Sequence, residues 1–293
     1  MTSKTRPLVS IGMPVYNGEK YICEALDSLL AQTFTNFELI ISDNASIDDT
    51  EIICRGYAKK DQRIRYIRQQ TNLGALGNFQ FVLEKGCSKY FMWAASDDKW
   101  EKGWIEALYS QLTKTGKCAV FGLVQQIDGG GQNVMHLANN RCFQFSGNRL
   151  WRRIAFFLQF EGAGKANLFY SLFEKKQLEE IRLAGYRSDY LALFDLLSST
   201  EFVTVNYVHL FKRIHDSNDG AGAEKTATSK LLDAITLKLL GRDIRVAASY
   251  LKYTTKGEKF LLTGLVPIKI FIDRKSTRLN SSHSDRSRMP SSA

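Results

Sequence analysis

The stretch MWAASDDKW places two adjacent carboxylates, Asp97 and Asp98, directly after an apolar run. Like charges repel each other and are costly to hold near the end of a buried strand. A divalent cation would offset that cost, because Mg²⁺ and Mn²⁺ prefer hard oxygen ligands such as carboxylates. A second interpretation is that the pair only caps the helix expected from Trp104 onward.

Polar and aromatic side chains also follow two other apolar runs. Asp43 and Asn44 come after the run at 37–42, and Tyr16 follows the run at 8–14. A carboxylate accepts hydrogen bonds, so Asp43 could bind a donor group of a ligand at this edge. Asp and Asn are also ordinary turn residues, and that interpretation stays open.

Strand and helix patterns alternate through the first half of the chain. Apolar runs predict strands, and apolar residues three and four apart predict helices. The expected strands are 8–14, 37–42, 64–68, 89–95 and 118–124; the expected helices are 19–32, one opened by a capping box at 46–49, one around 79–83 and one around 104–112. The alternation is typical of an α/β protein with a mostly parallel, Rossmann-like sheet and helices on both faces. The carboxyl ends of parallel strands share one edge, so Asp43, Asp97 and Asp98 are expected together there.

The second half of the chain has a less regular pattern. We expect a hairpin turn at 128–132, an amphipathic helix at 148–160, helical spacing at 185–199, a strand-rich run at 202–215 and a helical segment at 223–252. No GxGxxG motif follows the first strand, which argues against a dinucleotide site.

The composition of the chain indicates a class of binding partner but does not identify the partner. The chain has 293 residues, a net charge of +10 and 44% hydrophobic residues, which favours a soluble globular protein with an anionic partner. Nucleotide, nucleic acid and acidic lipid all fit that charge. Basic residues do not gather with aromatic ones in a recognisable nucleic-acid module, apart from residues 151–153, so nucleic acid is not expected as the partner. Five scattered cysteines without a CxxC pair, and no signal peptide, favour a cytoplasmic location.

Two segments near the C-terminus have their own composition. The apolar segment 261–272 is too short to span a bilayer, and Lys259 and Lys269 flank or interrupt it. It is expected either to pack on the core or to make peripheral contact with the cytoplasmic face of a membrane. The Ser/Arg-rich residues 273–293 resemble translated sequencing-adapter DNA and are expected to be non-native and outside the fold.

Several motifs, taken in order, resemble the family 2 glycosyltransferases of GT-A fold. They are MPVYNGEKYICEALDSLLAQTFTNFELIISDNASIDDT, NLGALGN, ASDD, GYRSDY and KRIH, and together they cover roughly residues 8–215. The resemblance implies an inverting transfer of a sugar from a nucleoside-diphosphate sugar to an acceptor hydroxyl. Within this resemblance Asp43 fits the base-reading role, because a carboxylate can accept the N3–H of uracil, whereas cytosine has no proton at that position. The resemblance therefore favours a UDP-sugar donor, with a glycan or lipid-linked acceptor in cell-envelope or exopolysaccharide synthesis. It divides the chain into a nucleotide-sugar-binding half (1–125), an acceptor and catalytic-base half (126–215) and a C-terminal segment (216–272).

The resemblance also implies roles for individual residues. Asp98 is the expected ligand of Mg²⁺ or Mn²⁺, and Asp97 is expected to face the ribose or the sugar. The remaining nucleotide-sugar-binding residues are expected to be Pro14, Val15 and Tyr16 beside the base, Asp43 on the base, and Arg68, Arg213 and His215 near the diphosphate. Ala95 departs from the family, which often has another aspartate at that position.

Asp189, in GYRSDY, resembles the position of the catalytic base that takes the proton of the acceptor hydroxyl. Ser188 precedes it where the family more often has Glu, and Asp195 is a competing candidate six residues on. An alternative to an enzyme is a catalytically inactive protein that binds a sugar nucleotide and acts as a regulator. An activity assay separates the two.

Overall fold

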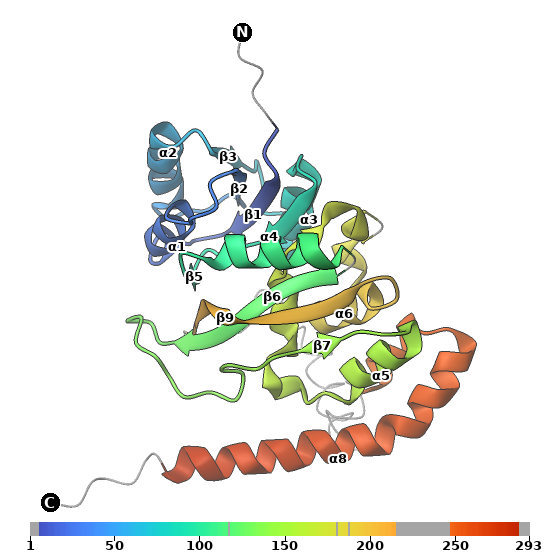
Figure 1. The fold of residues 1–293 in the computed structure, drawn as a ribbon. Coiled ribbons are helices and arrows are strands. Elements are labelled where there is room, and N and C mark those ends of the chain that lie inside the picture. Colours follow the sequence, from blue (N-terminus) through green and yellow to red (C-terminus); the bar gives the residue numbers. More distant parts are fainter. Residues whose placement is uncertain (1–5, 117, 180, 187, 215–246, 287–293) are drawn as a thin grey trace, which may run out of the picture.

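The main sheet of the computed structural model carries the first half of the chain (Figure 1). Its strands run in the order β3-β2-β1-β4-β8, all parallel except β8. They span Val9–Val15 (β1), Phe37–Asp43 (β2), Ile64–Arg68 (β3), Tyr90–Trp93 (β4) and Phe173–Glu174 (β8). The structure describes residues 6–116, 118–179, 181–186, 188–214 and 247–286. The predicted α/β class with a mostly parallel sheet is confirmed.

Both faces of the central strand β1 are covered. All seven of its residues are buried, although successive side chains point to opposite faces. Helix α3 (Gly74–Lys85) covers one face so closely that a Cβ on Gly12 would lie 2.7 Å from Val82. Helices α1 (Ile22–Leu30) and α2 (Thr50–Lys60) complete the predicted strand–helix alternation.

A second sheet holds the strand that was expected to complete the first one. Its order is β5-β9-β6, with β7 also paired to β9. The strands span Lys99–Trp100 (β5), Cys118–Ile127 (β6), Gln144–Phe145 (β7) and Glu201–Arg213 (β9), and α4 (Trp104–Thr115) packs on β6 and β9. The prediction that 118–124 belongs to the main sheet is wrong. This run pairs in parallel with a strand about 80 residues later, and no local pattern records that pairing.

The remaining elements of the second half are short helices around this sheet. They are α5 (Arg149–Leu158), α6 (Asp189–Leu196) and the 3₁₀ helices at Glu161–Ala163, Lys165–Tyr170, Lys175–Leu178, Leu183–Gly185 and Leu251–Tyr253. The amphipathic helix predicted at 148–160 is confirmed as α5, and Asn148 caps it by accepting a hydrogen bond from the Trp151 amide. Most of the helical segment predicted at 223–252 lies outside the described residues.

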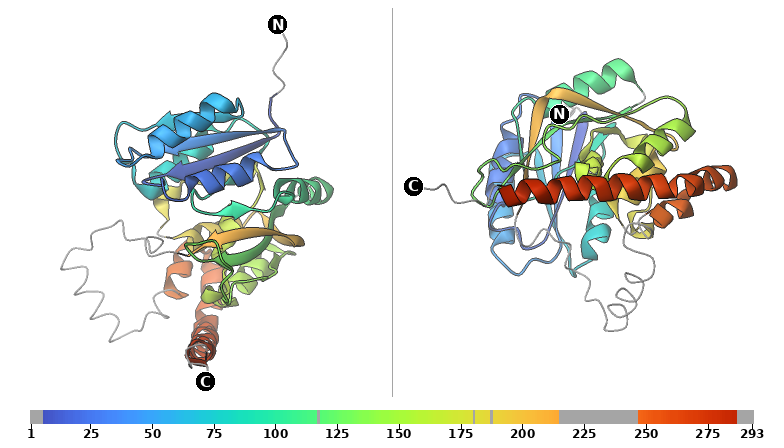
Figure 2. Two further views of the ribbon diagram at one scale, coloured as in Figure 1. Left: turned by 90° about the vertical axis from the view of Figure 1, so that its left-hand side faces the viewer. Right: turned by 90° about the horizontal axis from the view of Figure 1, so that it is seen from below.

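Helix α8 (Lys256–Arg286) runs along the outside of the molecule, as the right-hand view of Figure 2 shows. Its inner face is tied to the core by Lys269, whose ammonium is fully buried 2.9 Å from both Glu161 and Asp273. Two predictions are therefore corrected. Lys269 cannot meet a membrane, and the chain beyond residue 272 is not wholly outside the fold, since Asp273 is buried and the helix continues. Among the described residues, no helix is both long and apolar enough to cross a bilayer.

Candidate active site

The strand register brings the predicted base-binding residues to one edge of the main sheet. Val15, Asp43 and Arg68 lie side by side at the carboxyl ends of β1, β2 and β3. Pro14 and Val15 are buried inside β1, so only Tyr16, which is 49% exposed, offers an open ring surface to a base. The wall predicted from these three residues therefore depends mainly on Tyr16.

Hydrogen bonds hold the loops after β1 and β2 together. The Asn17 amide donates to Ser46 Oγ at 2.9 Å, and the Ile47 amide donates to Asn17 Oδ1 at 3.0 Å. Ser46 is thus not part of a capping box. Helix α2 begins at Thr50, whose amide donates to Asp48 Oδ1. The predicted box fails because Ser46 is used between loops, a contact that the local sequence does not encode.

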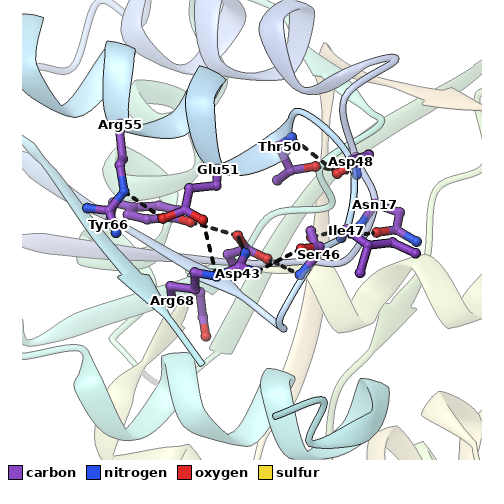
Figure 3. A network of polar contacts seen from close by, with 12 residues as sticks. Asn17, Asp43, Ser46, Ile47, Asp48, Thr50, Glu51, Arg55, Tyr66 and Arg68 are labelled. Carbon is purple, nitrogen blue, oxygen red and sulfur yellow. Dashed lines mark hydrogen bonds and ion pairs between the residues drawn. The ribbon is translucent and has the colours of Figure 1, made fainter. Parts of the chain in front are cut away.

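Asp43 is fully buried at the centre of the network in Figure 3. Its Oδ1 accepts the Ser46 amide at 2.8 Å, while its Oδ2 accepts Tyr66 Oη at 2.6 Å and Arg68 Nη1 at 2.8 Å. Burial by itself raises the pKa of Asp43, but these hydrogen bonds outweigh it and the pKa is lowered. The carboxyl group is therefore ionised and acts as an acceptor at neutral pH.

Arg68 belongs to the same network. Its guanidinium pairs with Asp43 and, at 3.2 Å, with Glu51, and it donates to the Ser46 carbonyl at 2.8 Å. These contacts place Arg68 over the carboxylate predicted to read the base. A contact with the diphosphate would require the guanidinium to leave two carboxylates.

Asparagine side chains next to this network connect the ends of β2 and β3 to α3. Asn44 Nδ2 donates to Asn72 Oδ1 at 2.8 Å, and Asn78 Nδ2 donates to the Ser42 carbonyl at 2.8 Å. Gly74 opens α3 at φ +73°, a conformation that suits glycine. Asn72, Gly74 and Asn78 thus shape the loop after β3 and the start of α3.

The Asp97–Asp98 pair lies between the two sheets, where the chain passes from β4 to β5. Asp98 is buried, and its Oδ1 accepts the amide of Arg213 on β9 at 2.9 Å. Burial, with a contribution from the charge of Asp97, raises the pKa of Asp98 to about 7. The pair does not cap α4, because β5 intervenes and the residue before α4 is Gly103. The carboxylates are thus held in place for something other than a helix cap.

Arg213 is fully buried behind this pair. Its Nε donates to the Asp97 carbonyl at 3.0 Å, its Nη1 to the carbonyls of Asp128 and Gly129, and its Nη2 to Glu24 Oε2 at 2.9 Å. This geometry differs from the predicted contact with the diphosphate, since the guanidinium is enclosed by protein groups. Arg213 instead fixes the position of the Asp97–Asp98 loop. His215, its predicted partner, lies outside the described residues.

Lys212, the neighbour of Arg213 on β9, is a site residue that the sequence reasoning missed. Its ammonium donates to Asn167 Oδ1 at 2.9 Å and lies 5.3 Å from the centre of the Tyr170 ring. Burial raises the pKa of both Asp98 and Asp189, and the positive charge of Lys212 lowers the pKa of both. The KRIH run was a usable signal for Lys212, whereas Asn167 and Tyr170 lie in a 3₁₀ helix without any periodicity.

Asp189 is the first residue of α6 and is half-buried. Burial raises its pKa, and the charge of Lys212 opposes that rise. The competitor, Asp195, has a different environment, because its Oδ2 accepts Tyr186 Oη at 2.5 Å and it lines a cavity of about 550 Å³. That cavity does not include Asp98 or Asp189 in its lining. The surroundings of Asp189 therefore fit the predicted base better than those of Asp195.

The Asp97–Asp98 pair fits a divalent cation by its chemistry. The two carboxyl groups are hard oxygen donors. Burial raises the pKa of Asp98 despite the opposing charges of Lys212 and Arg213, so a bound cation would stabilise its ionised form. The described residues contain no group of three or more metal-ligating side chains. A cation here would take its remaining ligands from phosphate and water, as Mg²⁺ often does.

The fold and this arrangement of carboxylates define the class of nucleotide-sugar transferases with a GT-A fold. The chain belongs to glycosyl transferase family 2, whose sequence model matches residues 10–173, more than half of the chain. This confirms the family and the fold that the motifs indicated.

Individual relatives cover different shares of the chain. The glycosyltransferase GlyG of Streptococcus pneumoniae is 26% identical over 213 residues, 70% of this chain and 71% of that protein. The putative teichuronic acid biosynthesis glycosyltransferase TuaG of Bacillus subtilis is 38% identical over 101 residues, 34% of this chain and 40% of that protein. An uncharacterized glycosyltransferase of Rickettsia bellii is 36% identical over 136 residues, 45% of this chain, and this chain covers only 19% of its length.

The solved structures of S. aureus TarS share the fold. TarS 1–349 in complex with UDP-GlcNAc superposes with a TM-score of 0.59 at 16% identity, covering 93% of this chain and 92% of that one. Identity at this level supports the architecture alone.

Proposed function

We propose that the protein is an inverting glycosyltransferase that moves a sugar from a UDP-sugar to an acceptor hydroxyl. One observation carries the proposal: the charge of Lys212 lowers the pKa of both Asp98 and Asp189 against the effect of burial, so the residue proposed to face the donor and the residue proposed as the base share one cationic neighbour. This suits a donor bound at Asp98 and a proton acceptor at Asp189. Family membership supports the reaction class.

In the proposed mechanism, ionised Asp189 takes the proton of the acceptor hydroxyl while the acceptor oxygen attacks the anomeric carbon. The new glycosidic bond forms as the bond to the diphosphate oxygen breaks, and UDP leaves with the bonding electrons. Attack from the side opposite to the leaving group inverts the configuration. Lys212 keeps positive charge near both carboxyl groups, which favours the ionised form of Asp189.

We propose Mg²⁺ or Mn²⁺ as the cofactor, held by Asp98 with Asp97 beside it. The cation would supply positive charge for the diphosphate as it leaves. Arg213 contributes by holding the backbone of this loop from behind.

The choice of UDP rests on Asp43. Its carboxylate is ionised but fully buried and already accepts three hydrogen bonds from the protein, so a base N–H reaches it only if Arg68 moves aside. TarS, which shares the fold, has been crystallised with UDP and with UDP-GlcNAc. The exposed ring of Tyr16 is available to stack on the base.

We further propose a glycan or lipid-linked acceptor in cell-envelope or exopolysaccharide synthesis, used at the cytoplasmic face of the membrane. The name of the relative TuaG supports the envelope setting. Apolar side chains that stay exposed on α8 support the location.

A panel of nucleotide sugars tests the donor. The purified protein with Mn²⁺ should hydrolyse a UDP-sugar faster than any GDP- or dTDP-sugar, with release of the nucleotide measured by chromatography. Faster hydrolysis of a GDP- or dTDP-sugar would refute the role of Asp43. UDP binding without any hydrolysis or transfer would favour an inactive binder.

A further inference from the structure

Helix α8 is apolar on two opposite sides. Its inner face contains Leu262 and Lys269, which are buried against the rest of the protein. Phe260, Ile268 and Phe271 are 82%, 48% and 66% exposed. At about 100° per residue, Phe260 and Phe271 project from the side opposite to Leu262, and Ile268 lies at the edge of that side, about 120° from Leu262. With Leu261, which is also exposed, they form what we call the outer face of α8.

The outer face does not pack on the described protein. The helix lies at the edge of the molecule in Figure 1 and crosses its near surface in the right-hand view of Figure 2. Exposed apolar residues are common singly, but four on one side of one helix form a patch of the kind that binds a partner.

The charges on α8 indicate the chemistry of that partner. Between residues 256 and 275, the charged side chains described as exposed are Lys256, Lys259 and Lys275. The two acidic side chains in the same stretch, Glu258 and Asp273, are buried in ion pairs. The helix thus combines an apolar face with exposed charge of one sign, which is the pattern of a helix that lies in the surface of an anionic membrane.

We propose that the outer face of α8 rests in the headgroup region of a bilayer that contains anionic lipid. The apolar side chains enter the acyl boundary. Lys256, about 40° from Phe260 around the helix, and Lys259, about 100° from it, extend along the edge of the outer face to the headgroup phosphates. The inner face stays on the protein, so the helix docks without leaving the fold. The inference deepens the proposed location of the enzyme, and it is tested without any sugar transfer, so its failure is distinguishable from failure of the proposed function.

Sedimentation of the full chain with vesicles is the direct test. The protein should sediment with vesicles of phosphatidylcholine and phosphatidylglycerol at low salt, and much less with phosphatidylcholine alone or at high salt. Phe260→Ser/Phe271→Ser should weaken binding by at least about tenfold. Lys256→Glu/Lys259→Glu should weaken binding to the anionic vesicles by about tenfold and remove its salt dependence.

Helix α2 offers matched controls, since it exposes Ile52 together with Lys59 and Lys60. Ile52→Ser and Lys59→Glu/Lys60→Glu should bind vesicles as the unaltered protein does. All variants change exposed side chains, so thermal unfolding should confirm that each is folded. Equal sedimentation of the α8 variants and the unaltered protein would overturn the proposal. So would a dimer in solution that Phe260→Ser/Phe271→Ser converts to monomer, because the face would then bind a second copy.

Discussion

Replacing Asp189 by Asn tests the proposed base most directly. The change keeps the shape of the side chain at the start of α6 and removes its basicity. General-base catalysis typically contributes about 10²–10⁴-fold, so transfer should fall by at least about a hundredfold. UDP affinity should hardly change, because the contacts assigned to the nucleotide lie at Asp43 and Asp98. Transfer is measured as kcat/KM with the donor found in the panel, and UDP affinity by calorimetry.

The environment of Asp189 adds a second readout. Burial raises the pKa of Asp189 in the folded protein, so its neutral form is favoured by folding. That contribution to stability is fully present below the unfolded pKa and is lost as pH rises through the folded pKa. At neutral pH the ionised carboxylate therefore destabilises the protein. Asp189→Asn should be more stable than the unaltered protein at pH 7, and the difference should shrink towards acid pH.

Asp195→Asn is the matched control. An asparagine can still accept the hydrogen bond from Tyr186, so transfer should stay within about threefold of the unaltered enzyme. If Asp189→Asn kept more than about a tenth of transfer while Asp195→Asn lost it, the base would be Asp195. If Asp189→Asn lost UDP binding together with transfer, the residue would act on the donor and the proposed division of the site would be wrong.

Three further predictions follow from the described contacts. UDP should bind more tightly with Mn²⁺ than with chelator, and Asp98→Ala should abolish that difference in calorimetry; equal affinities in the unaltered protein would contradict a metal at this site. Lys212→Met should lower kcat/KM by about tenfold or more, which is the equivalent of one hydrogen bond to a charged group. Lys212→Arg should keep most of the activity, and an unchanged kcat/KM for Lys212→Met would contradict the role proposed for this cation. Gly12→Ala should lower the free energy of unfolding by about 1–3 kcal/mol, because the new Cβ would lie 2.7 Å from Val82. Gly56→Ala, with no atom within 4 Å of the new Cβ in α2, should raise the free energy of unfolding by about 0.5–1 kcal/mol. Chemical denaturation measures both variants, and a Gly12→Ala protein more stable than Gly56→Ala would contradict the prediction.

The local pattern of the sequence was sufficient to predict the strands of the main sheet and the helices that alternate with them. Each strand was a short apolar run and each helix repeated apolar residues every three or four positions, so the signal was contained within a single element. The same pattern predicted that Asp43 and Asp98 follow parallel strands. Parallel strands end on one edge, so a geometric rule turned sequence positions into a predicted site.

The tertiary structure decided what surrounds those residues. Arg213 was expected at the diphosphate but is enclosed behind Asp98, and Lys212 beside it reaches the site instead. Neighbours on a strand point to opposite faces, so which of the two faces the site depends on the pairing of β9. That strand pairs with β6 and β5, which lie about 80 and 110 residues earlier in the chain. Local propensity carries no information about pairing at such distances.

The C-terminal segment also shows what the sequence determines and what only the tertiary structure decides. Its composition revealed an apolar stretch that could pack on the core or meet a membrane, and the structure shows one helix with one face packed on the core and another face exposed. Lys269 looked like an interfacial residue in the sequence, yet it is buried because Glu161, more than 100 residues earlier, provides its counter-charge. A residue's type and its near neighbours determine what it can do, whereas its partner in the folded chain determines whether it faces water, membrane or core.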